Sequence, residues 1–437
     1  AMGNRPGPVL VDIPKDIQQH YPRDPEGNYT PPRMPAVIEQ LEEPVGGIHS
    51  DQLEEACRLI REAKRPVIYA GGGVVSSNTS AYLLKLAEVL SIPVTTTIMG
   101  LGAFPPDHPL SLHVLGMHGT KYANVAINEA DLVLAIGVRF DDRVTGKVSE
   151  FIKNGKIIHI DVDRSELNKN KRVTLAIWAD LRHALPQLTY AAQPGDCADW
   201  VRRCQQWREE WPLTADEGPN DQIRPQWAIQ KLSEMASSDA LVSVGVGQHQ
   251  MWAMQHFAVR KPRAFLSSSG LGTMGFGLPA AIGGKVACPD RLVIDIDGDG
   301  SLNMAIHELS TCHRYGLGVK VVVINNQWLG MVRQWQDMIY QRHRAESALS
   351  DPTTSVKNPA EVEVYPDFVT IAAGYKVRSE RVTRKSELAA AYNRLLADPN
   401  EPYLLDVVVA SEENVYPMIP AGATYREILL RDDDESS

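Results

Sequence analysis

Short apolar runs alternate with amphipathic segments along most of the 437 residues. Apolar runs rich in β-branched residues predict strands, and segments whose apolar residues recur every three or four positions predict helices. The predicted strands are 66–70, 93–98, 131–136, 156–160, 241–246, 292–296, 319–324 and 403–409. The predicted helices are 52–63, 80–90, 228–236, 279–287, 302–312, 365–373 and 386–397. Because strands and helices alternate, we predict an α/β fold with two doubly wound parallel-sheet domains.

Composition divides the chain into five parts. Residues 1–49 hold an apolar run at 8–14, predicted to be a strand, and then a proline-rich linker, so we expect the end of a further domain here. Residues 50–190 and 225–411 are the two predicted domains. The polar, Trp-bearing stretch 191–224 is the predicted linker between them, with a helix expected within 196–220. Residues 412–437 form a tail that we expect to cover a site.

One predicted βαβ unit, between residues 291 and 335, carries the strongest chemical signal. Its first strand runs into Gly298-Asp299-Gly300, Ser301 is the predicted N-cap of the helix, and the second strand stops at Asn325-Asn326. Strands joined by one crossover helix are parallel and usually adjacent, so their carboxyl ends meet at one edge of the sheet. Ligands of open α/β sheets bind at that edge.

Hard oxygen ligands are predicted to gather at this edge. Asp299 and Asn326 offer side-chain oxygens, and we expect the backbone carbonyl of Trp328 beside them, a set that suits Mg²⁺. The glycines that flank Asp299 let a diphosphate approach the backbone, and the helix N-terminus offers free N–H groups. Each motif alone is a common turn. Separated by 24 residues (301–324) at consecutive strand ends, they indicate a metal-bridged diphosphate site, with spacing that resembles thiamin-diphosphate (ThDP) enzymes.

The strand ends of the first predicted domain also carry polar chemistry. Gly71-Gly72-Gly73 follows one strand, Gly137 and the charged loop 139–143 follow another, and Asp161 ends a third. Glycines beside phosphates and an Asp near ribose hydroxyls suit a dinucleotide. Triple glycines also make ordinary tight turns, so these residues alone leave both interpretations open.

Charge and composition limit the possible partners. The formal net charge of −10 argues against nucleic acid and anionic membrane surfaces. No apolar run reaches about 18 residues, the length that spans a bilayer. The five cysteines form no CxxC motif, which favours reduced thiols in an intracellular protein. We find no targeting peptide, and expect a cytoplasmic or plastid location.

With these motifs placed, the chain resembles the catalytic subunits of the acetohydroxyacid (acetolactate) synthase family over essentially its whole length. The similarity is carried by GPVLVDIPKDIQ, GVRFDDRVTGK, GQHQMWA, GLGTMGFGLPAAIG, NNQWLGMVRQW and YPMIPAG. The family has three α/β domains, of which this chain matches the central FAD-binding type and the C-terminal ThDP pyrophosphate-binding type. The resemblance implies condensation of pyruvate with a second 2-ketoacid, with ThDP, Mg²⁺ and a structural FAD as cofactors. It also implies a homodimer or larger oligomer and leaves a regulatory subunit open.

The same resemblance assigns site residues. Metal ligands would be Asp299, Asn326 and Trp328, although other members often carry His or Glu in place of the Trp. ThDP would be held by Gly247, Gln248, His249, Gly272, Met274, Gly300, Ser301 and Met331. FAD would be held by Arg5, Gly71, Gly72, Gly73, Met99, Gly116, Met117, His118, Gly137, Arg139, Asp141 and Asp161. Met274 would support the bent cofactor, Arg143 and Trp335 would shape the pocket for the second ketoacid, and Lys15 would line its channel.

Plainer interpretations remain beside these assignments. Met274 and Trp335 could be core packing, and Lys15 a surface lysine. The chain could instead be another FAD-containing ThDP enzyme, of the pyruvate oxidase or glyoxylate carboligase type, or a non-catalytic cofactor-binding module. The family uses a glutamate of its pyrimidine-binding domain to activate ThDP, and we expect that domain to precede Pro8. We therefore expect the 437 residues alone to be inactive.

Overall fold

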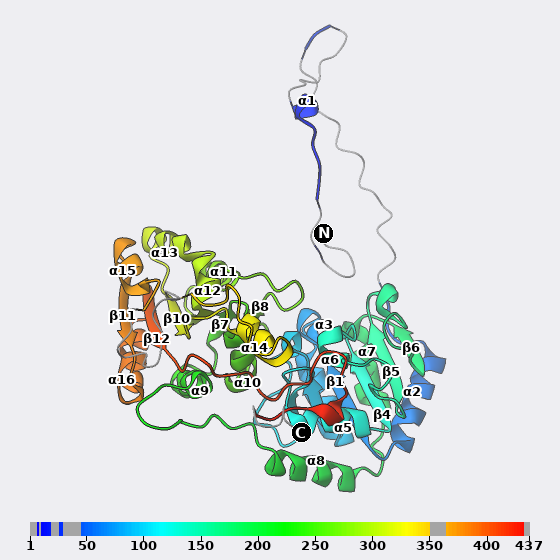
Figure 1. Ribbon diagram of the computed structural model, residues 1–437. Helices are drawn as coiled ribbons and strands as arrows, with labels where there is room; N and C mark the ends of the chain where they lie inside the picture. The colour runs from blue at the N-terminus through cyan, green and yellow to red at the C-terminus, as the bar shows by residue number, and fades with distance from the viewer. Residues whose placement is uncertain (1–6, 8–9, 19–25, 29–44, 350–363, 432–437) are drawn as a thin grey trace.

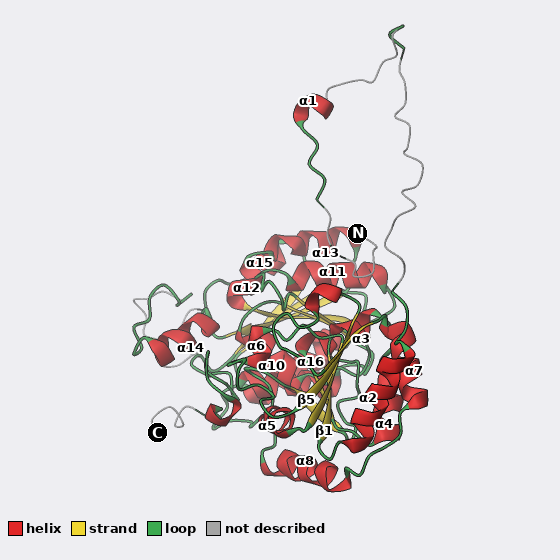
Figure 2. Cartoon of the chain, turned by 90° about the vertical axis from the view of Figure 1, so that its right-hand side faces the viewer, coloured by secondary structure: helices red, strands yellow, loops and turns green. Residues whose placement is uncertain are grey.

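The structure is a computed structural model that describes residues 7, 10–18, 26–28, 45–349 and 364–431. Two six-stranded sheets dominate it, one in each half of the chain, and helices flank both (Figures 1 and 2). Every pairing between neighbouring strands is parallel. The predicted α/β fold with two doubly wound sheets is thus confirmed. Over the described ranges no helix is long and apolar enough to cross a membrane.

The first sheet has the strand order β3-β2-β1-β4-β5-β6. Its strands are β1 (Pro66–Ala70), β2 (Val94–Thr96), β3 (Ser111–Val114), β4 (Leu132–Ile136), β5 (Lys156–Asp161) and β6 (Leu175–Trp178). Its helices are α2 (Ser50–Glu62), α3 (Gly72–Ser76), α4 (Ser80–Leu90), α5 (Lys121–Glu129), α6 (Asp142–Thr145), α7 (Leu181–Ala191) and α8 (Ala198–Glu210), with 3₁₀ turns η1 (Ile98–Gly100) and η2 (Arg164–Glu166).

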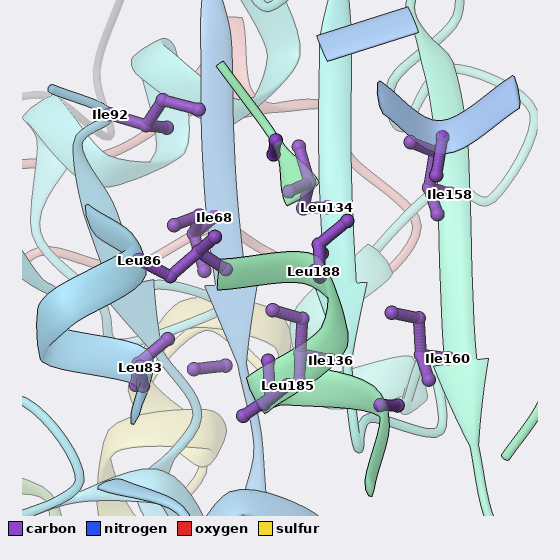
Figure 3. Packing of buried hydrophobic residues seen from close by; sticks show 14 of the residues in the cluster. Ile68, Leu83, Leu86, Ile92, Leu134, Ile136, Ile158, Ile160, Leu185 and Leu188 are labelled. Carbon is purple, nitrogen blue, oxygen red and sulfur yellow. The ribbon is translucent and has the colours of Figure 1, made fainter. Parts of the chain in front are cut away.

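Alternate side chains of these strands enter two separate cores, as expected for a sheet covered on both faces. Figure 3 shows one core, where leucines of α4 and α7 pack on isoleucines and a leucine of the strands: Leu83, Leu86, Leu185, Leu188, Ile68, Leu134, Ile136, Ile158 and Ile160. The opposite face packs on α5 and α8, the latter through Trp200, Cys204 and Trp207. Helix α8 confirms the helix predicted within 196–220, and it packs on the first sheet.

The second sheet has the order β11-β12-β10-β9-β7-β8. Its strands are β7 (Leu241–Val244), β8 (Phe265–Ser267), β9 (Val293–Gly298), β10 (Val319–Asn325), β11 (Arg378–Val382) and β12 (Tyr403–Val408). Its helices are α9 (Pro225–Met235), α10 (Gln248–His256), α11 (Gly277–Ala287), α12 (Asp299–Asn303), α13 (Leu309–Tyr315), α14 (Gly330–Ile339), α15 (Phe368–Gly374) and α16 (Lys385–Leu396), with the 3₁₀ turn η3 (Ile306–Glu308). The 3₁₀ turn η4 (Tyr425–Glu427) lies in the tail, where Tyr425 bonds Glu129 of α5.

In each sheet the chain order reverses at an interior pair of strands. β1 lies beside β4, with β2 and β3 on its other side, and β7 lies beside β9, with β8 on its other side. Chain order therefore reverses between β1 and β4 and between β7 and β9. Open α/β sheets bind ligands in the crevice at the carboxyl ends of such strand pairs.

Three local predictions are wrong. Ser301 is not an N-cap, because α12 begins at Asp299 with Gly298 as its N-cap. The predicted helix 302–312 is divided among α12, η3 and α13. Of the predicted strand 8–14, the described residues 10–14 form no strand, and Leu10 is 89% exposed. No described strand pairs with residues 10–14, so their apolar pattern has no partner among the described residues.

Candidate functional site

The first candidate site lies at the carboxyl ends of β7, β9 and β10. Asp299 opens α12 at the end of β9, and Asn326 follows β10, its direct parallel neighbour. The predicted meeting of these two strand ends is therefore confirmed. Both side chains are buried, Asp299 at 2% and Asn326 at 5% exposure.

The Asp299 carboxylate is held by backbone N–H groups on both sides. Oδ1 accepts from Gly300 N at 2.8 Å, and Oδ2 accepts from Gln327 N at 2.6 Å, across the gap between the two strand ends. Burial raises the pKa of Asp299 to about 7, and the two N–H donors oppose that rise. A buried, oriented carboxylate of this kind is stabilised as an anion by a cation placed next to it.

Asn326 is fixed by a second set of contacts. Its Oδ1 accepts from Trp328 N at 3.1 Å, and its Nδ2 donates to Gln248 Oε1 at 3.1 Å. Gly330 allows this approach, because a Cβ there would overlap Gln248 Oε1 and lie 2.6 Å from Asn326 Nδ2. The amide oxygen of Asn326 and the backbone of Trp328 thus lie together, next to the Asp299 strand end.

The donor set is mixed rather than a cluster of acids. Across the described parts of the chain, no three His, Cys, Asp or Glu side chains gather at a point where they could hold a metal. Asp299 with Asn326 and a backbone carbonyl is instead the set that Mg²⁺ takes when water and phosphate complete its shell.

Ser301 ties three loops together. Its Oγ accepts from Val246 N at 3.2 Å and from Gly275 N at 3.0 Å. It therefore fixes the loop after β7 and the glycine-rich loop before α11 against the start of α12. The sequence identified Ser301 as a site residue but assigned it a helix-capping role that it does not have.

His249 lies under the same edge. Its Nε2 is 3.3 Å from Asp297 Oδ1, and a Cβ on Gly298 would contact its ring. His249 follows Gly247 and Gln248 at the start of α10, so these three predicted residues face the Asp299 strand end together. Asp297 was not predicted from the sequence as part of the site.

Met274 reaches this edge as well. A Cβ on Gly300 would lie 3.6 Å from Met274 Cε, while a Cβ on Gly272 would have only Val246 Cγ1 within 4 Å, at 3.9 Å. The loop before α11 therefore leaves open space at Gly272. A Cβ on Gly270 in the same loop would lie 3.9 Å from a guanidinium nitrogen of Arg139, so the loop reaches toward the central domain.

The second candidate site lies at the carboxyl ends of β1 and β4. Gly73 and Gly137 are in close backbone contact, because a Cβ on Gly73 would lie 2.6 Å from Gly137 Cα. Gly137 also has φ +60°, which favours glycine. Gly71 and Gly72 complete the turn, with Met99 next to Gly72. The predicted glycines thus meet at the point where this sheet reverses.

Other predicted residues surround this point. Asn124 fixes Gly116 through two hydrogen bonds, and Met117 N donates to Arg143 O at 2.8 Å. Asp141 caps α6 and pairs with Arg139. Asp161, 9% exposed, ends β5, and its Oδ1 accepts from Asp163 N at 2.8 Å.

Arg143 opens onto a cavity of about 140 Å³ between the central domain and the tail. Met117 and tail residues 419–425 are among its lining. The tail thus covers this part of the molecule, crossing from β12 to the side of α5 (Figure 1).

The two candidate sites are joined by polar contacts that the sequence did not predict. Gln255 Nε2 donates to His118 O at 2.8 Å and to Tyr416 O at 3.1 Å. His118 Nδ1 lies 3.3 Å from Pro417 O, and burial lowers the pKa of His118 to about 4, so the ring is neutral at pH 7. No periodicity identifies such residues, because their partners are backbone groups distant in sequence.

Four predicted residues are not brought to these edges by a described contact. Lys15 is exposed on α1 (Lys15–Gln18), which lies apart from both sheets (Figure 1). Arg5 lies outside the described residues. Trp335 is half-buried on α14, with no described contact to Arg143, and Met331 packs partly on the core of the second domain.

Comparison with known proteins agrees with this geometry. Residues 53–188 match the family described as "Thiamine pyrophosphate enzyme, central domain". Residues 245–407 match "Thiamine pyrophosphate enzyme, C-terminal TPP binding domain". The chain therefore belongs to the thiamine pyrophosphate enzymes, and its second sheet is that of a TPP-binding domain.

Within this class the chain is similar to acetolactate synthases. It is 49% identical to "Probable acetolactate synthase 2, chloroplastic" of Oryza sativa subsp. japonica, with 100% of this chain and 65% of the relative covered. It is 47% identical to "Acetolactate synthase 1, chloroplastic" of Zea mays, with 99% and 66% covered. "Acetolactate synthase, chloroplastic" of Arabidopsis thaliana is 45% identical, with 99% and 63% covered. The chain spans about two thirds of the length of these relatives, and the resemblance seen in its motifs is confirmed.

Proposed function

We propose that this chain supplies the FAD-type and ThDP-binding parts of an acetolactate synthase. The observation that carries the proposal is the pairing of Asp299 with Asn326 at adjacent strand ends of a TPP-binding domain. Similarity to acetolactate synthases along the whole chain supports the choice of reaction. The overall reaction joins pyruvate to a second 2-ketoacid, pyruvate or 2-ketobutyrate, and releases CO₂.

Mg²⁺ would be held by Asp299, Asn326 and the carbonyl of Trp328. The fit rests on the buried carboxylate, whose orientation two backbone N–H groups fix, and on the amide oxygen beside it. Trp328 contributes only backbone in this assignment, so its difference from the His or Glu of other members does not change the ligand set.

ThDP would take its diphosphate contacts from the residues around this metal. Gly247, Gln248, His249, Gly300 and Ser301 surround the Asp299 edge, and the open space at Gly272 with Met274 beside Gly300 would take the rings. When bound, ThDP supplies a thiazolium ring that accepts the electron pair left behind when CO₂ departs. The chain's own groups would bind and orient the cofactor and keep water from its reactive carbon.

FAD would occupy the reversal point between β1 and β4. The close contact of Gly73 with Gly137 leaves backbone, rather than side chain, at the place where a diphosphate would lie. Arg139, which pairs with Asp141, would contact the diphosphate, and Asp161 the ribose. Its role would be structural, because the overall reaction involves no net redox change.

The second ketoacid would lie between Arg143 and Trp335. Arg143 opens onto the cavity beneath the tail, and a guanidinium pairs well with a carboxylate. A homodimer or larger assembly, with the regulatory subunit left open, is part of the same proposal. A plastid or cytoplasmic location is also part of the proposal, because the names of the relatives describe them as chloroplastic.

The test is a colorimetric acetolactate assay with saturating pyruvate, Mg²⁺, ThDP and FAD. Because we expect the activating glutamate outside these residues, the assay has two arms, with and without a separately produced pyrimidine-binding domain. Acetolactate in the supplemented arm supports the proposal. Acetate formed only with an added electron acceptor would instead identify a pyruvate oxidase, and silence in both arms would favour a cofactor-binding module.

The metal assignment has its own measurement. Asp299→Ala removes the only carboxylate of the set, and we expect calorimetry to show no Mg²⁺-dependent ThDP binding. Asp290→Ala, in the exposed turn before β9, is the control that should bind as the wild type does. Unchanged affinity in Asp299→Ala would refute the assignment.

A further inference from the structure

Helix α14 buries two polar side chains although two of its apolar ones are exposed. Its side chains Arg333 and Gln334 are buried, at 1% and 0% exposure, whereas Val332 and Ile339 are 47% and 55% exposed. A surface helix normally turns its apolar face inward. Burying a glutamine without partners is costly, so its hydrogen bonds must account for its position.

Every hydrogen-bonding group of the Gln334 amide has a partner. Its Oε1 accepts from Gln248 Nε2 at 2.9 Å and from Val415 N at 3.0 Å. Its Nε2 donates to Val415 O at 3.2 Å and lies 3.6 Å from Met418 Sδ. One side chain therefore joins α10 to residues 413–418, which we call the tail strap.

Gln248 carries the connection to the metal site. Its Nε2 also donates to Glu413 O at 3.1 Å, and its Oε1 accepts from Asn326 Nδ2 at 3.1 Å. A continuous chain of hydrogen bonds thus runs from Asn326 through Gln248 and Gln334 to Val415. An amide can serve in such a chain because it donates and accepts at once.

The far side of the tail is fixed to the central domain. Ile419 N donates to Met117 O at 2.8 Å, and Gln255 bonds both Tyr416 O and His118 O. The strap is therefore held by Gln334 on one side and by the loop 116–118 on the other. Undocking it would leave both Gln334 and Gln248 with buried, unpaired groups.

We propose that Gln334 is a positioning residue. It couples docking of the tail strap to occupancy of the first candidate site, which Gln334 reaches through Gln248 and Asn326. The identity of the occupant, Mg²⁺ with ThDP, rests on the proposed function. Coupling between two sites is reciprocal: if the docked strap improves ThDP affinity, ThDP must favour the docked strap by the same factor. Loss of about one oriented hydrogen bond at Gln248 corresponds to an affinity change of about 5–10-fold.

Hydrogen exchange of the strap amides, followed by mass spectrometry, is the test. In the full chain, saturating Mg²⁺ and ThDP should slow exchange over residues 413–418. Gln334→Met, which keeps the length but removes both polar groups, should weaken ThDP binding about 5–10-fold and make exchange of the Val415 amide independent of ThDP, while Glu413 stays bonded directly to Gln248. A merely structural role would raise exchange without removing that dependence.

Gln336→Met is the matched control. Gln336 lies on the same helix and also makes two hydrogen bonds, but to Ala345 O and from Ser347 Oγ, away from the strap. The Gln336→Met variant should have the ThDP affinity and the hydrogen-exchange protection of the strap that the wild type has. Retained ThDP-dependence of Val415 exchange in Gln334→Met, or equal loss in Gln336→Met, would overturn the proposal.

A cofactor-free arm separates this inference from the proposed function. Asn326→Ala removes the donor to Gln248 Oε1, two hydrogen bonds away from the strap. Faster strap exchange in this variant without any cofactor supports the coupling even if the wild type binds no ThDP, a result that would overturn only the proposed function. Unchanged exchange overturns the coupling.

Discussion

Replacing Ser301 by Ala tests whether the Ser301 hydroxyl holds the three segments of the first candidate site together. The variant deletes one oxygen that accepts hydrogen bonds from Gly275 N and Val246 N. The Gly275 group is buried, so leaving it unsatisfied costs about 1–3 kcal/mol, and loss of the partly buried Val246 bond costs about 0.5–1.5 kcal/mol. We expect the free energy of unfolding to fall by about 2–4 kcal/mol. A simple N-cap serine, as the sequence suggested, would account for only about 1 kcal/mol.

Urea unfolding of the wild type and the variant measures this difference. Ser310→Ala is the control, because Ser310 is an exposed serine on α13 and its loss should change stability by less than about 0.5 kcal/mol. A loss of about 1 kcal/mol or less in Ser301→Ala would refute the three-loop role. The same variant should bind ThDP more weakly, since the loops that it releases carry Gly247 and Met274.

Three other outcomes are expected. Burial lowers the pKa of Lys320 from 10.5 to about 8, so with rising pH the folded state loses this proton before the unfolded state does. Between about pH 7 and about pH 9.5 the free energy of unfolding of the wild type should therefore rise by about 2 kcal/mol relative to that of Lys320→Met, as urea unfolding would measure. A difference in unfolding free energy that does not change with pH would contradict the lowered pKa of Lys320. Under the proposed FAD site, Gly73→Ala should force Gly137 away and abolish the flavin absorbance that the proposal expects, whereas Gly283→Ala, with open space around it, should keep it. In an active assembly that includes the pyrimidine-binding domain, Trp335→Leu should reduce the preference for 2-ketobutyrate over pyruvate about tenfold in competition assays. An unchanged product ratio would make Trp335 packing only.

Strand ends could be predicted from the sequence because local chemistry and topology agree there. A buried β-branched run must stop at a polar turn, and a single crossover helix brings two such ends to one edge. Asp299 and Asn326 could therefore be paired before any coordinates. The glycines after β1 and Gly137 after β4 could be placed together in the same way, although the sequence left their function open.

Contacts between elements distant in sequence could not be predicted in this way. Gln334 and Gln255 look like ordinary surface residues, because hydrophobic periodicity gives no sign that a helix buries its polar side. The strand predicted at 8–14 failed for the opposite reason: its pattern was adequate, but no described neighbour pairs with residues 10–14. Local pattern predicts an element only where a tertiary partner exists.

Strand β9 shows both a predictable strand end and distant contacts that its local pattern does not predict. Its alternation of Ile294, Asp295, Ile296 and Asp297, taken alone, is typical of a strand with one face in water, yet both acids are fully buried. Gly245 and Gly277 make room for them, since a Cβ on either would overlap a carboxylate oxygen. Burial and the charge of Asp297 raise the pKa of Asp295 well above its usual value. Asp297 Oδ1 then accepts from Gly298 N at 2.9 Å beside His249, which places this buried polar face directly beneath the Asp299 edge.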